Sequence, residues 1–201
     1  MKLFYAPGAC SLSPHIALLE AGIQFDLEKV DFSKKMTSMG DFTKINPKGY
    51  VPALMLDNGE LLTEGAVIVQ YIADQKPEKN LMPKVGTFER YRTQEWLNFI
   101  STELHKGFSP LFNKTAPEET KAVAREKLHT RLDYVSQHLT KNHFLMGSQY
   151  TVADAYLFTV LTWSEHVKVD ITKLQGLMGF MERMKSRPAT HTALKAEGLL
   201  K

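Results

Sequence analysis

Strand and hairpin signals are confined to the first part of this chain, and this asymmetry most constrains its fold. Short apolar runs separated by turn residues occupy residues 2–75, whereas residues 88–201 show only the three- and four-residue spacing of helices. Proline, glycine and charged residues fill the stretch between them. The pattern predicts an α/β unit followed by an all-helical unit. We place the first unit at residues 1–78, a linker at 79–87 and the second unit at 88–201.

The first unit has the order strand–helix–strand, loop, strand–strand–helix. The second strand is expected to run parallel to the first, because a helix lies between them. The dipeptide Asn58-Gly59 is a strong hairpin signal for the last two strands. The expected strands are residues 2–6, 25–30, 51–56 and 60–62, the helices begin near Leu12 and Glu64, and residues 31–48 form a polar, loop-rich segment with room for a short helix.

The second unit contains a central helix by its composition. Residues 155–163 are apolar on most sides, and a helix of that kind belongs at the centre of a unit. Thr151 and Asp154 have the spacing of a capping box before it, and Thr115 to Glu118 repeat that signal before another helix. Further helices are expected over residues 88–108 and 174–184, with a last one opened by Pro188.

Charge and cysteine content exclude several classes of protein. The net charge is +3, with 7 basic and 10 acidic residues up to residue 78 and 18 and 12 after it. A net charge of this size is too small to indicate nucleic acid as the main partner. A single cysteine excludes an internal disulfide and fits a reducing cytosol.

There is no secretory leader and no apolar run of the ~20 residues that a spanning helix needs, so we expect a cytoplasmic protein with no membrane partner.

Cys10 lies between a turn and the start of a predicted helix, where Ser11 or Ser13 is a candidate cap. Unpaired N–H groups and the positive end of the helix dipole there stabilise a thiolate, which predicts a lowered thiol pKa. The alternative is a buried cysteine that acts as a small hydrophobic residue. The spacing Cys10-x-x-Ser13 lacks a second thiol. Any disulfide at Cys10 is therefore mixed and needs an external thiol, for which glutathione is the obvious candidate.

Two further positions are candidates for ligand contacts. If the Val51-Pro52 bond is cis, the backbone N–H and C=O of Val51 are free to pair with an extended peptide; the alternative is an ordinary trans proline. Glu64 and Gly65 open a helix whose N–H groups suit a carboxylate, with Gly65 allowing close approach or a positive φ. The alternative there is an ordinary helix start.

The seven histidines form no HExxH motif and have no clustered cysteine, so no metal is expected.

Five stretches together resemble the glutathione S-transferases, and within them the bacterial beta class. They cover most of the chain in the order and spacing of that family. They read MKLFYAPGACSLS, NPKGYVPAL, LLTEGAVIVQYIAD, EWLNFISTELHKGFSPLF and YTVADAYLFTVLTW. The resemblance implies a thioredoxin-like N-terminal domain that holds glutathione and a helical domain that lines a site for small hydrophobic electrophiles. It also implies a homodimer.

The resemblance assigns roles residue by residue. Cys10 matches a cysteine that lies against the glutathione sulfur, and His105 matches a histidine close to that thiol. Val51 matches the residue that precedes a cis-proline and pairs with glutathione through its backbone. Glu64 and Gly65 match the pair that holds the γ-glutamyl end of glutathione. Lys35 matches a loop residue that contacts glutathione, although the neighbouring Lys34 leaves the choice between the two lysines open. The remaining matches form a strip on the first long helix that faces the cleft and in part reaches across a dimer interface: Asn98, Thr102, Glu103, Leu104 and His105.

Residue spacing agrees with part of this assignment. Asn98, Thr102 and His105 stand at i, i+4 and i+7, which places them on one face of a helix. Lys106 and His105 would add positive potential that favours a thiolate. The expected function is conjugation of glutathione to electrophiles, with thiol–disulfide exchange through Cys10. The alternative is a binding or docking module with little turnover, because a fold does not fix a function.

Overall fold

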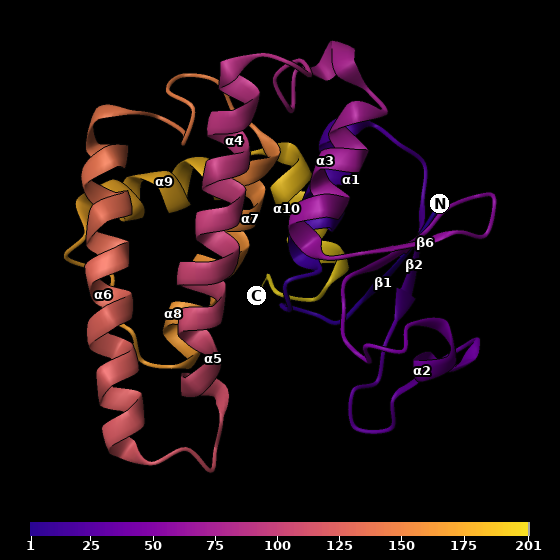
Figure 1. Cartoon of the computed structure of the whole chain (residues 1–201), viewed down its shortest axis with the longest axis horizontal. Coiled ribbons are helices and arrows are strands. Elements are labelled where there is room, and N and C mark those ends of the chain that lie inside the picture. The colour runs from indigo at the N-terminus through magenta and orange to yellow at the C-terminus, as the bar shows by residue number, and fades with distance from the viewer. Residues whose placement is uncertain (201) are drawn as a thin grey trace.

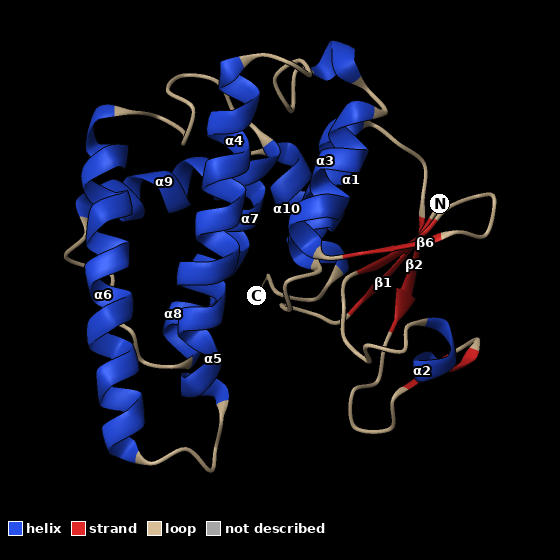
Figure 2. Cartoon of the chain, in the orientation of Figure 1, coloured by secondary structure: helices blue, strands red, loops and turns tan. Residues whose placement is uncertain are grey.

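The computed structural model describes residues 1–200 and has the two expected units. Figure 1 shows the sheet and its helices on one side and a group of long helices on the other, and Figure 2 shows that all strands lie in the first unit. The four-stranded sheet has the order β2-β1-β5-β6, with β1 parallel to β2 and the other neighbours antiparallel. The elements of this sheet and its helices are β1 Lys2–Tyr5, α1 Leu12–Ala21, β2 Asp26–Lys29, β5 Ala53–Met55, β6 Leu61–Thr63 and α3 Gly65–Asp74.

The sheet register follows the apolar pattern. Leu3 and Phe4 of β1 are both fully buried, one on each face of the sheet, because successive side chains of a strand point to opposite faces. Leu3 joins the large core shared with the helices, and Phe4 joins a smaller core with Phe42. The predicted hairpin is present, with Leu54 opposite Leu62 and Gly59 at a φ of 87° in its turn.

The segment expected as a polar loop holds more structure than its sequence indicates. A two-stranded hairpin forms from β3 Met36–Thr37 and β4 Gly40–Asp41, and the short helix α2 Phe42–Ile45 follows. The Asp41 carboxylate accepts the N–H of Thr43 at 2.9 Å and caps that helix. Strands of two residues are too short to carry a periodic signal, which is why the sequence does not predict them.

The second unit is all-helical after a short turn, as predicted. Every residue of α7 is buried, which confirms its central position. The domain boundaries expected at residues 78 and 87 stay predictions. The elements are η1 Pro77–Lys79, α4 Phe88–Phe99, η2 Ile100–His105, α5 Lys106–Phe112, α6 Glu118–Lys141, α7 Val152–Leu161, α8 Trp163–His166, α9 Gln175–Lys185 and α10 Pro188–Ala196.

The helix expected over residues 88–108 continues to Phe112 and contains a π-helical segment, η2. The N–H of Lys106 bonds the carbonyl of Ser101, five residues earlier, instead of the usual four. Such segments change the direction of the side chains that follow and are frequent at functional sites.

Two of the predicted caps are wrong and one is confirmed. Ser11 stands at the N-cap of α1, but its hydroxyl bonds Ala6 in the preceding turn, and Ser13 donates to the carbonyl of Cys10. Thr115 does not cap α6, because it donates to Asn113 in a local turn. Asp154 does form the predicted cap of α7, accepting the N–H of Thr151 at 2.8 Å.

Within residues 1–200, no helix combines the length and apolar character needed to cross a membrane.

Candidate functional site

Cys10 lies in the turn between β1 and α1, where its side chain is partly buried. Its thiol donates to the carbonyl of Val51 at 3.1 Å, which connects this turn to the start of β5. The turn itself is held from the second unit at Gly8: the Trp163 indole donates to its carbonyl at 2.8 Å, and its N–H donates to Glu197 at 2.9 Å. Cys10 is therefore placed by contacts from both units.

The predicted lowering of the Cys10 pKa is wrong in this structure. Burial raises the pKa of the Cys10 thiol to about 12. Backbone N–H groups of Cys10 and Ser11 and the charge of Lys106 oppose this rise, and Glu64 adds to it. The helix start does act in the expected direction, but loss of hydration has the larger effect. Cys10 is thus a protonated thiol, able to donate a hydrogen bond.

Val51 precedes a cis peptide bond to Pro52, as the resemblance implies. Its backbone N–H and C=O pair with no other backbone group among residues 1–200, and the C=O accepts only the Cys10 thiol. A buried residue with an unpaired backbone beside a thiol is suited to take an extended peptide as a further strand.

Glu64 stands immediately before α3 with a φ of 73°, a strained conformation for a residue other than glycine. Its carboxylate accepts from the Lys48 ammonium and from the Tyr50 hydroxyl, the latter at 2.9 Å. The hydrogen bond from Lys48 is the main cause of the lowered Glu64 pKa. Positive φ therefore belongs to Glu64 and not to Gly65. A Cβ at Gly65 would meet Pro52 at 3.6 Å, an ordinary contact distance.

His105 lies half-buried between two aromatic side chains. Its Nδ1 is 2.7 Å from the hydroxyl of Tyr156, and its ring centre is 4.8 Å from that of Trp163. Burial, helped by the positive charge of Lys106, lowers the pKa of His105 to about 4. The expectation that His105 contributes positive charge is therefore wrong at neutral pH. Lys106 alone supplies it.

The expected strip on the first long helix does not share one face. Thr102 and Glu103 line a groove against α6, where Glu103 pairs with Arg131 at 2.7 Å. His105 instead turns toward α7, and Leu104 is fully buried in the core. The π-helical segment accounts for this divergence, because the spacing i, i+4, i+7 holds only for a regular α-helix. Asn98 is exposed on α4.

Lys35 is exposed on the loop before β3, with a φ of 53°. Within the described residues its side chain makes neither a hydrogen bond nor an ion pair. The structure thus leaves open the contact that the resemblance assigns to it, which stays a prediction.

Sequence reasoning missed three side chains that complete the site. Lys48 and Tyr50 hold Glu64, and both lie in the quoted stretch NPKGYVPAL. Tyr156 holds His105 and lies in the apolar run after the capping box. One signal was available for Tyr156, because a tyrosine in a helix that is otherwise apolar must find a partner for its hydroxyl.

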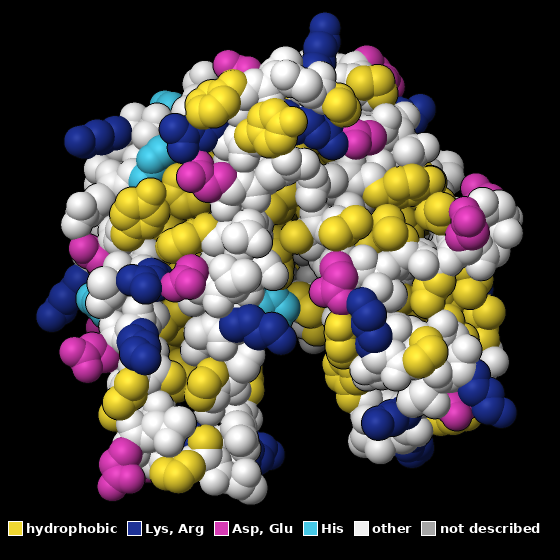
Figure 3. All heavy atoms as spheres, in the orientation of Figure 1, with side chains coloured by type: hydrophobic (Ala, Val, Ile, Leu, Met, Phe, Trp, Pro, Cys, Tyr) yellow, Lys and Arg dark blue, Asp and Glu magenta, His cyan; other side chains and the backbone are white. Residues whose placement is uncertain are grey.

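These groups surround a hollow between the two units. Figure 3 shows the molecule deeply indented there, with His and Lys or Arg side chains on the helical wall and Asp or Glu and Lys or Arg side chains opposite. Among residues 1–200, no three His, Cys, Asp or Glu side chains cluster closely enough to hold a metal ion.

Comparison with known proteins identifies the family. The "Glutathione S-transferase, N-terminal domain" matches residues 8–75, and the "Glutathione S-transferase, C-terminal domain" matches residues 99–188. Glutathione S-transferase GstA of Escherichia coli O157:H7 is 52% identical over 200 residues, covering 99% of this chain and 100% of that protein.

Two solved structures extend the match. A beta-class glutathione S-transferase of Sphingomonas chungbukensis is 46% identical, with a TM-score of 0.96 and complete coverage of both chains. A sphingomonad glutathione S-transferase solved in complex with glutathione is 44% identical, with the same TM-score and coverage. The fold and the enzyme class that the sequence motifs implied are confirmed. The chain belongs to the glutathione S-transferase family and is closely related to its bacterial beta class.

Proposed function

We propose that the hollow binds glutathione as an extended peptide against Val51. The unpaired backbone of Val51 beside the Cys10 thiol carries this proposal, since it offers a donor and an acceptor for the cysteinyl unit and a thiol for its sulfur. The related sphingomonad structure, which contains glutathione, supports it.

The two ends of the peptide have charged partners in the proposed site. Glu64 would take the ammonium of the γ-glutamyl end, and the N–H groups at the start of α3, from Gly65 onward, would take its carboxylate. Lys35 would reach the carboxylate of the glycyl end. Since Lys48 and Tyr50 already hold Glu64, its carboxylate is in place and ionised before the ligand arrives.

Catalysis would rest on the state of the glutathione sulfur. On binding, the protonated Cys10 would turn its S–H from the Val51 carbonyl to that sulfur, and Lys106 adds positive potential, so the bound thiolate is favoured. The glutathione thiol gives its proton to solvent as it ionises. The sulfur lone pair then forms a bond to the electrophilic carbon, and the leaving group departs with the electron pair of its own bond. Trp163 and Phe112, in edge contact at a centroid distance of 5.8 Å, offer an apolar wall for a small hydrophobic electrophile.

Exchange through Cys10 is the less favoured activity. A mixed disulfide forms when the Cys10 thiolate attacks the disulfide of oxidised glutathione and expels one glutathione thiolate. The raised pKa of Cys10 leaves little of that thiolate at neutral pH. Conjugation does not need it.

Calorimetric titration with reduced glutathione and turnover of 1-chloro-2,4-dinitrobenzene test the proposal. We expect binding by the native chain, weaker binding by Glu64→Gln, and conjugation that Cys10→Ala slows without abolishing. Intact-mass analysis after treatment with oxidised glutathione measures exchange, and we expect slow addition of one glutathione at Cys10. Binding without turnover would favour the binding-module alternative. No binding at all would contradict the proposal.

We also propose that two copies of the chain form a dimer through the face made by α3, α4 and α6. Thr102 and Glu103 line a groove against α6, whereas His105 turns toward α7, so their contact with glutathione would be made in a second copy. Exposed apolar side chains on this face include Val67, Phe88 and Tyr91.

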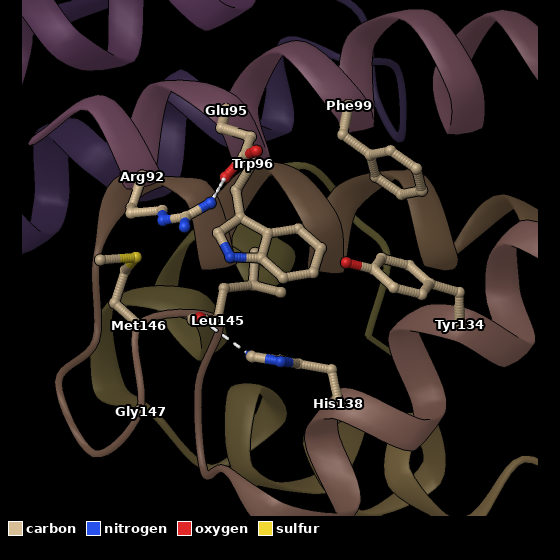
Figure 4. A pocket seen from close by; sticks show the side chains of 9 residues that line it. All are labelled: Arg92, Glu95, Trp96, Phe99, Tyr134, His138, Leu145, Met146 and Gly147. Carbon is tan, nitrogen blue, oxygen red and sulfur yellow. Dashed lines mark hydrogen bonds and ion pairs between the residues drawn. The ribbon is translucent and has the colours of Figure 1, made fainter. Parts of the chain in front are cut away.

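A cavity of about 520 Å³ between α4 and α6 hollows the same face. Figure 4 shows Trp96 at its centre between Tyr134, His138 and Phe99, with the ion pair of Arg92 and Glu95 beside it. An aromatic concavity of this kind is suited to receive a side chain of the second copy.

Light scattering tests the dimer. We expect a mass of twice 22.8 kDa, and a shift toward one chain in Tyr91→Glu but not in Phe32→Glu, whose exposed ring lies in the first unit before β3. A chain that is monomeric and still binds glutathione with full affinity would contradict the proposed contribution of Thr102 and Glu103.

A further inference from the structure

The hydrogen bond between His105 and Tyr156 bears on the tautomer of the His105 ring as well as on its position. Tyr156 comes from the buried helix α7, and its hydroxyl is 2.7 Å from His105 Nδ1. The rings meet edge to face at a centroid distance of 6.0 Å. A neutral imidazole carries one proton on either nitrogen, and the hydrogen bond of one nitrogen decides which.

The direction of this hydrogen bond follows from the surroundings. Burial raises the pKa of Tyr156, so the phenol keeps its proton, and His105 is neutral above a pH of about 4. Tyr156 is buried, and among residues 1–200 its hydroxyl makes its one hydrogen bond with His105 Nδ1. If this phenol only accepted from His105, its own buried O–H would have no acceptor, so the phenol directs its O–H to Nδ1. The proton of His105 must then be on Nε2.

The position of His105 gives that proton a use. Trp163, which packs on the His105 ring, donates to Gly8 only two residues before Cys10, and Tyr156 lies close enough to Cys10 for that thiol to affect its pKa. His105 therefore stands beside the turn that holds the Cys10 thiol, against which the sulfur of glutathione is proposed to bind. A donor there lowers the energy of negative charge on sulfur, whereas an acceptor would raise it.

We propose that Tyr156 is a positioning residue, which holds His105 in the Nε2–H tautomer so that the imidazole donates to the anionic sulfur of the bound thiol. This inference rests on the proposed binding of glutathione in the hollow. Tyr156 contributes through His105 and does not itself touch the thiol.

Nitrogen-15 NMR of the histidine side chains tests the tautomer directly and needs no substrate. We expect an acceptor-type Nδ1 and a protonated Nε2 in the native protein, and a mixture of tautomers in Tyr156→Phe. A protonated Nδ1 in the native protein, or a tautomer unchanged by Tyr156→Phe, would overturn the proposal. Because this measurement is made without glutathione, it separates failure of the inference from failure of the proposed function.

Kinetics test the consequence. We expect Tyr156→Phe to lower kcat by about 5-fold, the effect of one lost hydrogen bond, with a smaller change in KM for glutathione. Tyr150→Phe is the matched control, because the buried Tyr150 hydroxyl has no hydrogen-bond partner among residues 1–200. It should leave kcat unchanged.

A double substitution distinguishes positioning from general packing. His105→Gln keeps an N–H donor near the Nε2 position and has no tautomer to fix. In that background we expect Tyr156→Phe to change kcat less than 2-fold, by the usual scale of non-interacting sites. An equal loss of kcat in both backgrounds, or a native kcat in Tyr156→Phe, would overturn the role proposed for Tyr156.

Discussion

Cys10 and His105 are both neutral at physiological pH, although one is acidic and the other basic. Burial is the first cause in each case, raising the pKa of Cys10 to about 12 and lowering that of His105 to about 4. Loss of hydration disfavours whichever form carries charge, so it moves acids and bases in opposite directions. The site is thus set up to donate hydrogen bonds to an anionic ligand and not to supply its own anion.

Slow alkylation of the ligand-free protein should report the state of Cys10. We expect iodoacetamide to modify Cys10 at pH 8 at least about 100-fold more slowly than it modifies a cysteine in an unstructured peptide, because only the thiolate reacts. Mass spectrometry of timed samples measures the rate, with the unfolded protein as the control. Modification as fast as that of the peptide would show that the thiol is ionised.

The same shift gives a pH dependence of folding. A thiol pKa raised in the folded state contributes stability below the ordinary pKa of 9.0, and this contribution is lost as the pH rises from 9.0 toward 12. Urea unfolding of Cys10→Ala should therefore show a smaller loss of stability with rising alkaline pH than the native chain.

Sequence reasoning selected candidate residues that lie together in the structure, but it was wrong about the electrostatics of Cys10 and His105. Cys10, Val51, Glu64 and His105 come from motifs, and the structure brings them to one hollow. Their pKa values depend on how far each side chain is buried, and burial is determined by the fold and not by the neighbouring residues in the sequence. Tyr156 was missed because its partner is 51 residues away in sequence.

At the scale of the element, the start of α7 shows how one carboxylate orders a loop. Asp154 is fully buried and accepts the N–H groups of Leu145 and Thr151, both at 2.8 Å. Burial raises its pKa to about 6. These hydrogen bonds tie the loop that follows α6 to the central helix.

Asp154→Ala would leave two buried N–H groups without acceptors. We expect a loss of about 3 kcal/mol in the free energy of unfolding, measured by urea titration. Asp133→Ala on α6 is the control, because among residues 1–200 its partly buried carboxylate accepts only from the exposed Gln137 side chain on the same helix, and it should change the free energy of unfolding by less than about 0.5 kcal/mol. A loss no larger than that of the control would show that water replaces the carboxylate.

Element prediction succeeded where a pattern was long and failed where it was local. The capping box of Thr151 and Asp154 and the buried helix after it were found, because a polar start and an apolar run reinforce each other. The π-helical segment was not found, since Ile100–His105 has the apolar spacing of an ordinary helix. One extra residue in a turn leaves no sequence mark, yet it decides where His105 points.

For the whole molecule, α1 is the element through which the two units join. Figure 1 shows α10 lying beside α1, although the two helices come from opposite ends of the described chain. Arg187, at the start of α10, pairs with Glu20 of α1 through two hydrogen bonds of 2.7 and 3.0 Å and covers the ring of Tyr150 at 3.8 Å.

Arg187→Met would leave the largely buried Glu20 carboxylate without a partner. We expect a loss of about 2 kcal/mol of stability in urea unfolding, with a single transition retained. Lys185→Met is the matched control, because its pair with Glu182 is exposed and should be worth less than about 0.5 kcal/mol. Equal losses in the two variants would contradict a structural role for the Arg187 pair.

The two hydrogen bonds that hold Gly8, to Trp163 and Glu197, also determine when the turn becomes ordered during folding. They join residues that are 155 and 189 positions apart in the sequence, so they close among the longest loops the chain can make. During synthesis, β1, α1 and Cys10 leave the ribosome long before Trp163 and Glu197 do. The turn that carries Cys10 therefore lacks these two hydrogen bonds until almost the whole chain has emerged, and the Cys10 thiol reaches its buried position only as one of the last events of folding.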